Sequence, residues 1–282
     1  MTATTTTQLI RVGHSPDPDD AFMFYAMTRG RIPLLGFQIE HLLEAIESLN
    51  QRALRGELEV TALSLHAYAY CGARYKILTS GTSMGDGYGP IVVAREPMTV
   101  DQLRQGDIAV AGALTTSALV LQLWLGRVPM TIVPFDRIMD AVRRGQVKAG
   151  VVIHEGQLTY DGQGLTKVVD LGEWWQRTAG LPLPLGVNGV RRDLPESQQR
   201  TIARLMRESI AYGLEHRNEA LTYAQLYSRG LDTDRTDQFV GMYVNHWTED
   251  CRAEGKAAMA ELLARASRAG LLRQPCLPEF VS

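Results

Sequence analysis

Two stretches of the sequence, ALRGELEVTALS at residues 53–64 and VRRGQVKAGVVI at residues 142–153, share one plan. Each starts as the end of a helix, passes through Arg-Gly, and leads through alternating polar and apolar residues into an apolar run. The glycine suits a left-handed helix C-cap, and the alternation indicates a strand. The echo predicts two similar α/β lobes, whose corresponding strands end at residues 64–66 and 154–155.

Short apolar runs alternate with helical patterns along the first two thirds of the chain. Strand-like runs occupy residues 9–13, 60–64, 90–94, 107–112, 130–135 and 149–154, and helix-compatible spacing occupies 45–56 and 117–126. Because alternating strands and helices build parallel sheets, we expect an α/β fold. The last third predicts helices from two apolar faces, one formed by Ile202, Leu205, Met206, Ser209, Ile210 and Gly213, the other by Met259, Leu262, Leu263 and Ala266.

The composition is that of an ordinary globular protein, with 45% hydrophobic and 21% charged residues among 282. A net charge of −2 leaves no basic surplus for a phosphate backbone, so we expect no nucleic-acid partner. Three cysteines without a C-x-x-C spacing indicate free thiols rather than a disulfide framework or a zinc site. The first residues lack a signal-peptide pattern, and no apolar run approaches the length of a membrane span. We therefore expect a cytoplasmic protein with no membrane partner.

The predicted lobes also predict where a ligand binds. In open α/β sheets, ligands bind beyond the carboxyl ends of the strands. The ends of the two corresponding strands, at residues 64–66 and 154–155, would therefore face a common cleft. A cleft between lobes is the default site for a small molecule.

The segment SPDPDD at residues 15–20 places three carboxylates around one proline. Asp17 fits an N-cap, Pro18 the first helical position, and Asp20 the third position of a capping-box-like arrangement. A calcium loop would need further oxygen ligands at a different spacing, which disfavours a metal site. Helix capping is compatible with ligand contact, so Asp19 is also a candidate for reaching the ligand.

Two further positions could carry chemistry. Thr115 or Thr116 could cap a helix whose first N–H groups, with the two hydroxyls, would receive a carboxylate or phosphate oxygen. His154 ends the apolar run 149–153, where burial can hold its ring in the neutral, proton-accepting form. His14 and His66 also follow strands. Each of these histidines could instead have a structural role, and the residues alone leave the choice open.

Seven segments stand out in order along the chain: SPDPDDAFMFYAM, LEAIESLNQRALRGELEVTALSLHAYA, GDGYGPIVVA, TTSALVLQLWL, AGVVIHEGQLTY, VVDLGEWWQRTAGLPLPLG and YVNHWTED. Together they resemble the 1,4-dihydroxy-6-naphthoate synthase family, which acts in menaquinone biosynthesis by the futalosine route. The resemblance runs from about residue 10 to the C-terminus, and VVIHEG and WWQRTAGLPLPLG are its most specific parts.

The resemblance implies a fold like that of type II periplasmic binding proteins. Two α/β lobes would be joined by crossover strands near residues 90–95 and 183–190, with the ligand in the cleft and a helical C-terminal region. Residues 1–92 and 187–282 would form one discontinuous lobe, and residues 93–186 the other.

The resemblance also implies a reaction, the cleavage of a carbon–carbon bond in cyclic de-hypoxanthine futalosine to release the dihydroxynaphthoate. The family needs no metal or organic cofactor. Its proton acceptor is the histidine of an I-H-E segment, which is His154 in this chain. The partner we expect is the small-molecule substrate, and we also consider a homodimer. The substrate-binding positions that the motifs carry over are Ala62, Leu63, Ser64, Thr115 and Thr116.

The chain departs from the family at the opening, which usually reads S-P-C-P-N-D. Asp17 replaces the cysteine, Asp19 replaces the asparagine, and His66 stands where a smaller or tyrosyl residue is expected. An extra carboxylate would repel an anionic naphthoate unless it faces away, is protonated, or pairs with His14 or His66. Three alternatives therefore stay open: a sister-branch enzyme acting on another small carboxylate, a non-catalytic solute-binding protein, and a chorismate dehydratase.

Overall fold

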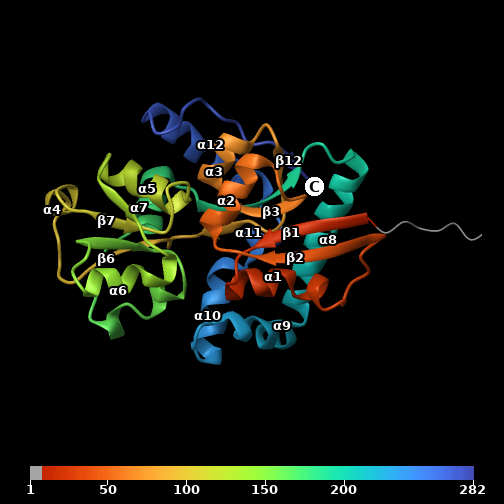
Figure 1. The fold of residues 1–282 in the computed structure, drawn as a ribbon, viewed down its shortest axis with the longest axis horizontal. Coiled ribbons are helices and arrows are strands. Elements are labelled where there is room, and N and C mark those ends of the chain that lie inside the picture. Colours follow the sequence, from red (N-terminus) through yellow and green to blue (C-terminus); the bar gives the residue numbers. More distant parts are fainter. Residues whose placement is uncertain (1–7) are drawn as a thin grey trace, which may run out of the picture.

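The chain forms two lobes, each built on its own β-sheet (Figure 1). The computed structural model describes residues 8–282. Lobe 1 holds a seven-stranded sheet in the order β12-β4-β11-β3-β1-β2, with β5 paired to β11. Its strands are β1 (Gln8–His14), β2 (Phe37–Leu43), β3 (Val60–Ser64), β4 (Tyr75–Leu78), β5 (Ser83–Gly85), β11 (Leu183–Arg191) and β12 (Phe280–Val281).

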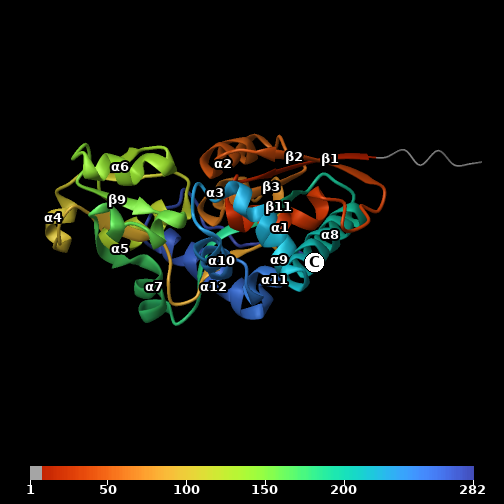
Figure 2. The same ribbon diagram turned by 90° about the horizontal axis from the view of Figure 1, so that it is seen from below.

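Lobe 2 holds a five-stranded sheet in the order β10-β6-β9-β7-β8. Its strands are β6 (Ile91–Ala94), β7 (Ile108–Val110), β8 (Met130–Ile132), β9 (Ala149–Val152) and β10 (Thr166–Asp170). Figure 2 shows α6 on one face of this sheet and α5 and α7 on the other. The helical segments are α4 (Val100–Arg104), η1 (Phe135–Arg137), α5 (Thr116–Leu125), α6 (Ile138–Arg143), η2 (Glu155–Leu158), η3 (Asp161–Gln163) and α7 (Leu171–Ala179).

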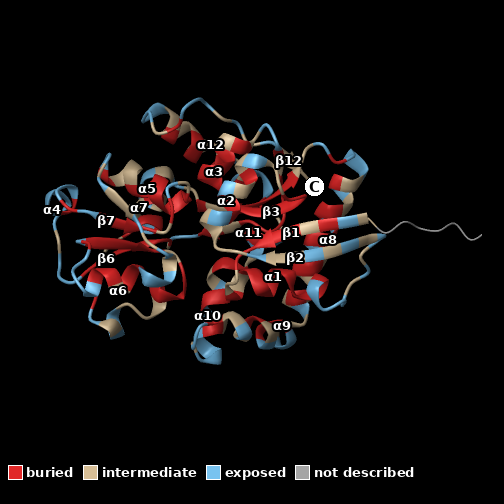
Figure 3. Ribbon diagram, in the orientation of Figure 1, coloured by how far each residue is buried: buried red, intermediate tan, exposed pale blue. Residues whose placement is uncertain are grey.

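The remaining helices belong to lobe 1, and the apolar faces predicted for the last third of the chain are buried there (Figure 3). The face on α8 packs with β1 and α1, while the face on α12 packs with α3 and β11. No helix within residues 8–282 is long and apolar enough to span a bilayer. The helices are α1 (Pro18–Thr28), α2 (Ile46–Arg55), α3 (Leu65–Cys71), α8 (Glu196–Glu215), α9 (Arg217–Ala224), η4 (Gln225–Tyr227), α10 (Thr233–Tyr243), α11 (His246–Glu249) and α12 (Arg252–Arg268).

The internal echo is a true structural repeat. The unit β1-α1-β2-α2-β3 in lobe 1 corresponds to β7-α5-β8-α6-β9 in lobe 2. In each unit the last strand runs parallel to the first and antiparallel to a strand that follows a crossing, β11 in lobe 1 and β6 in lobe 2. Gly56 and Gly145 adopt left-handed φ angles of 70° and 69°, as the shared Arg-Gly predicts. The two-lobed α/β fold is confirmed.

The chain crosses between the lobes twice, and the two crossings lie together. It leaves lobe 1 after β5 and returns through β11, and Leu183 of β11 pairs with Gly85 of β5. We propose that the lobes divide at these crossings, between β5 and β6 and between α7 and β11, a few residues before the expected boundaries at 92 and 186. The segment that leaves lobe 1, between β5 and β6, also packs against the start of α7. The backbones of Gly89 and Gly172 are in direct contact there. A side chain at either position would separate the two segments.

We expect Gly172→Ala to destabilise the protein, because a Cβ there would lie 2.0 Å from the backbone carbonyl of Tyr88. Backbone atoms cannot yield as a flexible side chain does, so the free energy of unfolding in urea should fall by about 3 kcal/mol. Gly162→Ala is the matched control, since a Cβ there meets nothing within 4 Å. It should change stability by less than about 0.5 kcal/mol. Equal effects of the two substitutions would contradict the packing argument.

Candidate functional site

A cavity of about 130 Å³ lies between the lobes, where the ends of several elements converge. The end of β3 and the start of α1 contribute from lobe 1, the start of α5 contributes from lobe 2, and β11 forms part of the wall. Because α1 and α5 are equivalent helices of the repeat, two helix N-termini meet at one cavity. The lining residues are Ser15, Asp17, Asp19, Asp20, Met23, Ile46, Ala62, Leu63, Ser64, Gly81, Ser83, Pro90, Thr115, Thr116, Ser117, Ile153, Leu185, Gly186, Val187, Asn188, Phe239 and Tyr243.

Six of the seven site residues expected from the sequence line this cavity, and His154 does not. The structure therefore brings together segments that are up to a hundred residues apart in the chain. The six are Asp19, Ala62, Leu63, Ser64, Thr115 and Thr116.

The threonine hydroxyls at the start of α5 are committed to the protein. Thr115 caps the helix by accepting from the N–H of Ala118 at 3.3 Å, and its hydroxyl donates to the carbonyl of Gly112. The hydroxyl of Thr116 donates to the carbonyl of Leu185 at 2.6 Å. The helix can therefore offer a ligand its first backbone N–H groups and the positive end of its dipole.

The lobe 1 wall offers both a hydroxyl and an amide oxygen. Ser64 donates its backbone N–H to Asn50 Oδ1 at 2.9 Å and accepts from Asn50 Nδ2 at 3.1 Å. Its hydroxyl can still donate to a ligand. Asn188 donates from Nδ2 to the carbonyl of Gly81, while its buried Oδ1 has no hydrogen-bond partner within residues 8–282. Asn188 can therefore accept from a ligand hydroxyl.

His154 does not line the cavity, although its neighbour in the chain, Ile153, does. Its Nε2 lies 2.9 Å from the carbonyl oxygen of Phe135, and its Nδ1 accepts from the backbone N–H of Gly156 at 3.0 Å. A carbonyl oxygen can only accept and an N–H can only donate, so Nε2 carries the proton and the ring is neutral. The basic nitrogen is nevertheless occupied by Gly156 in this conformation.

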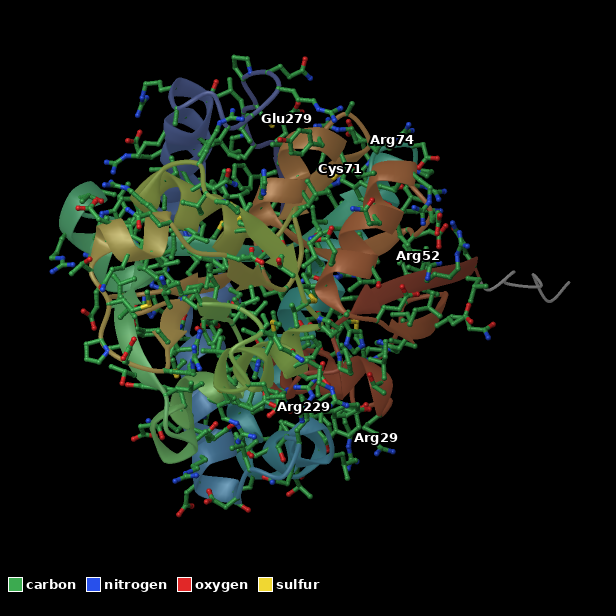
Figure 4. All side chains as sticks on the ribbon, turned by 60° about the vertical axis from the view of Figure 1, so that its left-hand side comes forward. Arg29, Arg52, Cys71, Arg74, Arg229 and Glu279 are labelled. Carbon is green, nitrogen blue, oxygen red and sulfur yellow. The ribbon has the colours of Figure 1, made fainter. Side chains whose placement is uncertain are left out.

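Arg229, on the loop after η4 and labelled in Figure 4, contacts both lobes through its ion pairs. Its guanidinium lies 2.9 Å from Glu155 of lobe 2 and 2.7 Å from Asp17 of lobe 1. It also donates to the carbonyl of Pro16 and covers the ring of Phe135 at 4.6 Å. Burial would raise the pKa of the Glu155 carboxyl, but the Arg229 guanidinium opposes burial, and the net effect lowers that pKa.

Further contacts hold the lobes against each other. The hydroxyl of Tyr243 on α10 donates to Gln157 of lobe 2 at 2.8 Å. Glu47 of α2 accepts from the backbone N–H of Leu114 at 3.3 Å. His66 lies 3.3 Å from the carbonyl of Thr115, which makes it a contact between the lobes rather than a residue of the cavity wall.

The aspartates at the start of α1 only partly follow the predicted capping. Asp17 occupies the N-cap position, but its side chain makes no cap hydrogen bond because it is ion-paired with Arg229. Asp20 does reach back from the third helical position and accepts from the backbone N–H of Ser15 at 2.7 Å. No group of three or more His, Cys, Asp or Glu side chains in the described part of the chain is arranged to hold a metal ion.

Two carboxyls of this group titrate abnormally. Burial and the charge of Asp17 raise the pKa of Asp19 to about 7, and Glu155 adds to the effect. Burial, with the charges of Asp19 and Asp17, raises the pKa of Asp20 well above its ordinary value. The cavity thus contains a carboxyl that can gain or lose a proton near neutral pH.

His14 belongs to a structural histidine pair rather than to the cavity wall. Its Nε2 lies 3.1 Å from Nδ1 of His41, its Nδ1 lies 3.2 Å from the carbonyl of Ser15, and its ring stacks on Phe24. Burial lowers the pKa of His14 to about 3 and that of His41 to about 4, so both rings are neutral at physiological pH.

Sequence reasoning missed Arg229, Tyr243, Asn188 and Phe239. Arg229 and Tyr243 come from the C-terminal helical region, where only apolar periodicity was informative. The Arg229–Glu155 pair is 74 residues apart in the chain. The sequence offered one indication of Arg229. Asp17 replaces the cysteine of the family motif, and a carboxylate at that position needs a cation nearby.

Comparison with known proteins shows the family to which this chain belongs. A family model described as menaquinone biosynthesis matches residues 10–268. The 1,4-dihydroxy-6-naphthoate synthase of Thermus thermophilus is 43% identical over 276 residues, covering 97% of this chain and all of that protein. The enzyme of the same name from Streptomyces coelicolor is 35% identical, covering 93% of this chain and 94% of that protein.

Solved structures agree with this relationship. A crystal structure of a protein from Archaeoglobus fulgidus superposes with a TM-score of 0.90 at 47% identity, covering 95% of this chain and 99% of that one. The alkanesulfonate-binding protein of Xanthomonas axonopodis superposes with a TM-score of 0.71 at 13% identity over 95% and 96% of the two chains, which confirms the periplasmic-binding-protein-like fold. The chain is therefore an enzyme of the menaquinone biosynthesis family, to which the 1,4-dihydroxy-6-naphthoate synthases belong.

Proposed function

We propose that this enzyme cleaves a carbon–carbon bond of cyclic de-hypoxanthine futalosine in the cleft between the lobes and releases 1,4-dihydroxy-6-naphthoate. The 43% identity to a 1,4-dihydroxy-6-naphthoate synthase over 97% of the chain carries this proposal. The cleft supports it, because the N-terminus of α5, a free serine hydroxyl and a buried amide acceptor suit a ligand with anionic oxygens and hydroxyls.

The reaction needs a group that takes a hydroxyl proton while the electrons of the broken bond pass into the aromatising ring. We propose His154 for this role. Its Nδ1 must exchange the Gly156 N–H for the ligand hydroxyl, so η2 has to rearrange when the ligand binds. Ile153 already lines the cavity, so the displacement required of the neighbouring ring is local.

Arg229 is a positioning residue in this scheme. It pairs with Glu155 beside His154 and covers Phe135, whose carbonyl accepts from His154. The same guanidinium is tied to Asp17 and Pro16 at the start of α1. Closure of the lobes and placement of the imidazole are therefore linked through one side chain. A closed cleft excludes water from the reacting groups.

The decisive assay incubates purified protein with cyclic de-hypoxanthine futalosine and measures dihydroxynaphthoate by chromatography. We expect turnover in the wild type. We expect His154→Ala to lower kcat by roughly 100-fold to 10,000-fold, the usual contribution of a general base, with substrate binding nearly unchanged.

The exposed His246 on α11 is the matched control, and His246→Ala should retain wild-type kcat. Wild-type turnover in His154→Ala would reject the assignment of the base. Tight binding of the substrate by the wild type without any product would instead favour a solute-binding protein.

We expect Arg229→Gln to lower kcat/KM by roughly tenfold to a hundredfold, because it leaves the buried Glu155 without its cation and frees the lobes to open. The radius of gyration measured by small-angle X-ray scattering should increase in the ligand-free variant. Arg200→Gln removes an exposed pair with Glu196 on α8 and is the control, with little effect expected on either quantity. Wild-type kinetics and radius in Arg229→Gln would show that the ion pairs do not govern closure.

A further inference from the structure

The charge of the cavity conflicts with the charge of the ligand. Three aspartates line the cavity, at positions 17, 19 and 20, and no lining residue in the described part of the chain is Lys, Arg or His. The ligand class of the proposed function is a bicyclic aromatic acid, which carries a carboxylate. Ionised carboxylates of the protein and of the ligand would repel each other at the short distances that the cavity imposes. At least one charge must therefore be neutralised when the ligand binds.

We propose that Asp19 binds the ligand as the neutral acid and donates a hydrogen bond to an anionic oxygen of the aromatic carboxylate, so that binding takes up one proton. This inference rests on the proposed function, since it takes the ligand to be a carboxylate. It makes Asp19 a specificity-determining residue: a protonated carboxyl can donate to an anion, which an ionised carboxylate cannot do. Hydrogen bonds of the type O–H···O⁻ are short and strong.

The contacts of the three aspartates single out Asp19. Asp17 lies 2.7 Å from the guanidinium of Arg229 and so has its own cation. Asp20 is buried, and its Oδ2 accepts from the backbone N–H of Ser15. The Asp19 side chain is half-buried, lines the cavity, and has no ion pair or hydrogen bond with another side chain among the described residues, although the backbone N–H groups of Asp19 and Asp20 lie close to its carboxyl. It is the carboxyl that remains available to a ligand.

The surroundings of Asp19 explain why it holds a proton. Asp17 and Asp20 lie on the same helix end as Asp19. Glu155 lies on η2, and Tyr243 faces Asp19 from α10. Burial is the main cause that raises its pKa to about 7, and the charge of Asp17 comes next. The cation of this group, Arg229, is already shared by Asp17 and Glu155.

The titratable groups on α9 and β2, which also pack against α1, contact residues other than Asp19. Glu219 of α9 accepts from the hydroxyl of Tyr25, and Arg217 of α9 covers the ring of Phe22. On β2, the neutral ring of His41 contacts His14. These groups therefore do not favour ionisation of the Asp19 carboxyl.

The uptake of a proton on binding determines how the dissociation constant of the ligand changes with pH. Below about pH 7 the Asp19 carboxyl of the free protein is already neutral, so the dissociation constant should not change with pH. Above that pH the carboxyl must first take up a proton, so the dissociation constant should rise about tenfold per pH unit. The effect is the reverse of that expected for a ligand hydroxyl bound by ionised Asp19.

The test measures binding of 1,4-dihydroxy-6-naphthoate by anaerobic titration calorimetry between pH 5.5 and 8.5, in buffers of different ionisation enthalpy. For the wild type we expect constant affinity up to about pH 7, about tenfold weaker binding per unit above it, and uptake of close to one proton at pH 8. Asp19→Asn keeps the shape and a donor without the charge. It should remove the slope and the proton uptake, and should bind more tightly than the wild type at pH 8.

Asp101→Asn, on the surface of α4, changes the net charge equally and should behave as the wild type. A gain of affinity at pH 8 cannot result from misfolding, so the Asp19→Asn outcome is unambiguous. A flat wild-type profile, or an unchanged slope in Asp19→Asn, would overturn the inference while leaving the proposed function intact. Absence of binding at every pH, together with absence of turnover, would overturn both.

Discussion

The pairing of the two crossing segments is the constraint on which the rest of the structure depends. β5 and β11 lie side by side between the lobes, and the close approach of Gly89 to Gly172 ties the outgoing crossing to α7. Because β3 pairs with β11 and β9 pairs with β6, each crossing is also part of a sheet. The carboxyl ends of β3 and β9 are thereby aimed at the same gap. A site made of both lobes follows from this geometry.

The repeat gives the cleft its electrostatic character. Equivalent helices, α1 and α5, both begin at the cavity, so two positive dipole ends converge on the ligand space. The chain uses them differently. The start of α5 is neutral, with its hydroxyls satisfied internally, whereas the start of α1 carries three carboxyls and is tied through Arg229 to lobe 2. One end can receive an anion directly, while the other requires a proton or a cation first.

Local chemistry explains which features could be predicted. β3 was placed at residues 60–64 and occupies Val60–Ser64, and the helix expected over 45–56 runs from Ile46 to Arg55 and ends at Gly56. Apolar periodicity and glycine caps act within a few residues, so sequence shows them directly. β2 was missed, since it is half-buried and carries charged residues, and β11, which contains Pro and Gly, was expected only from the family resemblance, as the crossover strand near 183–190. Their pairing, not their propensity, makes them strands.

The sequence by itself determined the two-lobed α/β fold, the cleft as the candidate site, and six of the residues that line it, because these depend on repeated local patterns and on family motifs. Only the tertiary structure decided how those residues are used. It directed the His154 ring toward Phe135 and Gly156, brought Arg229 to Glu155 across 74 residues, and placed Asp19 beside Asp17 and Asp20 in the cavity wall. The ionisation and ion pairing of these side chains depend on interatomic distances and on burial. Both are set only when the two lobes pack against each other.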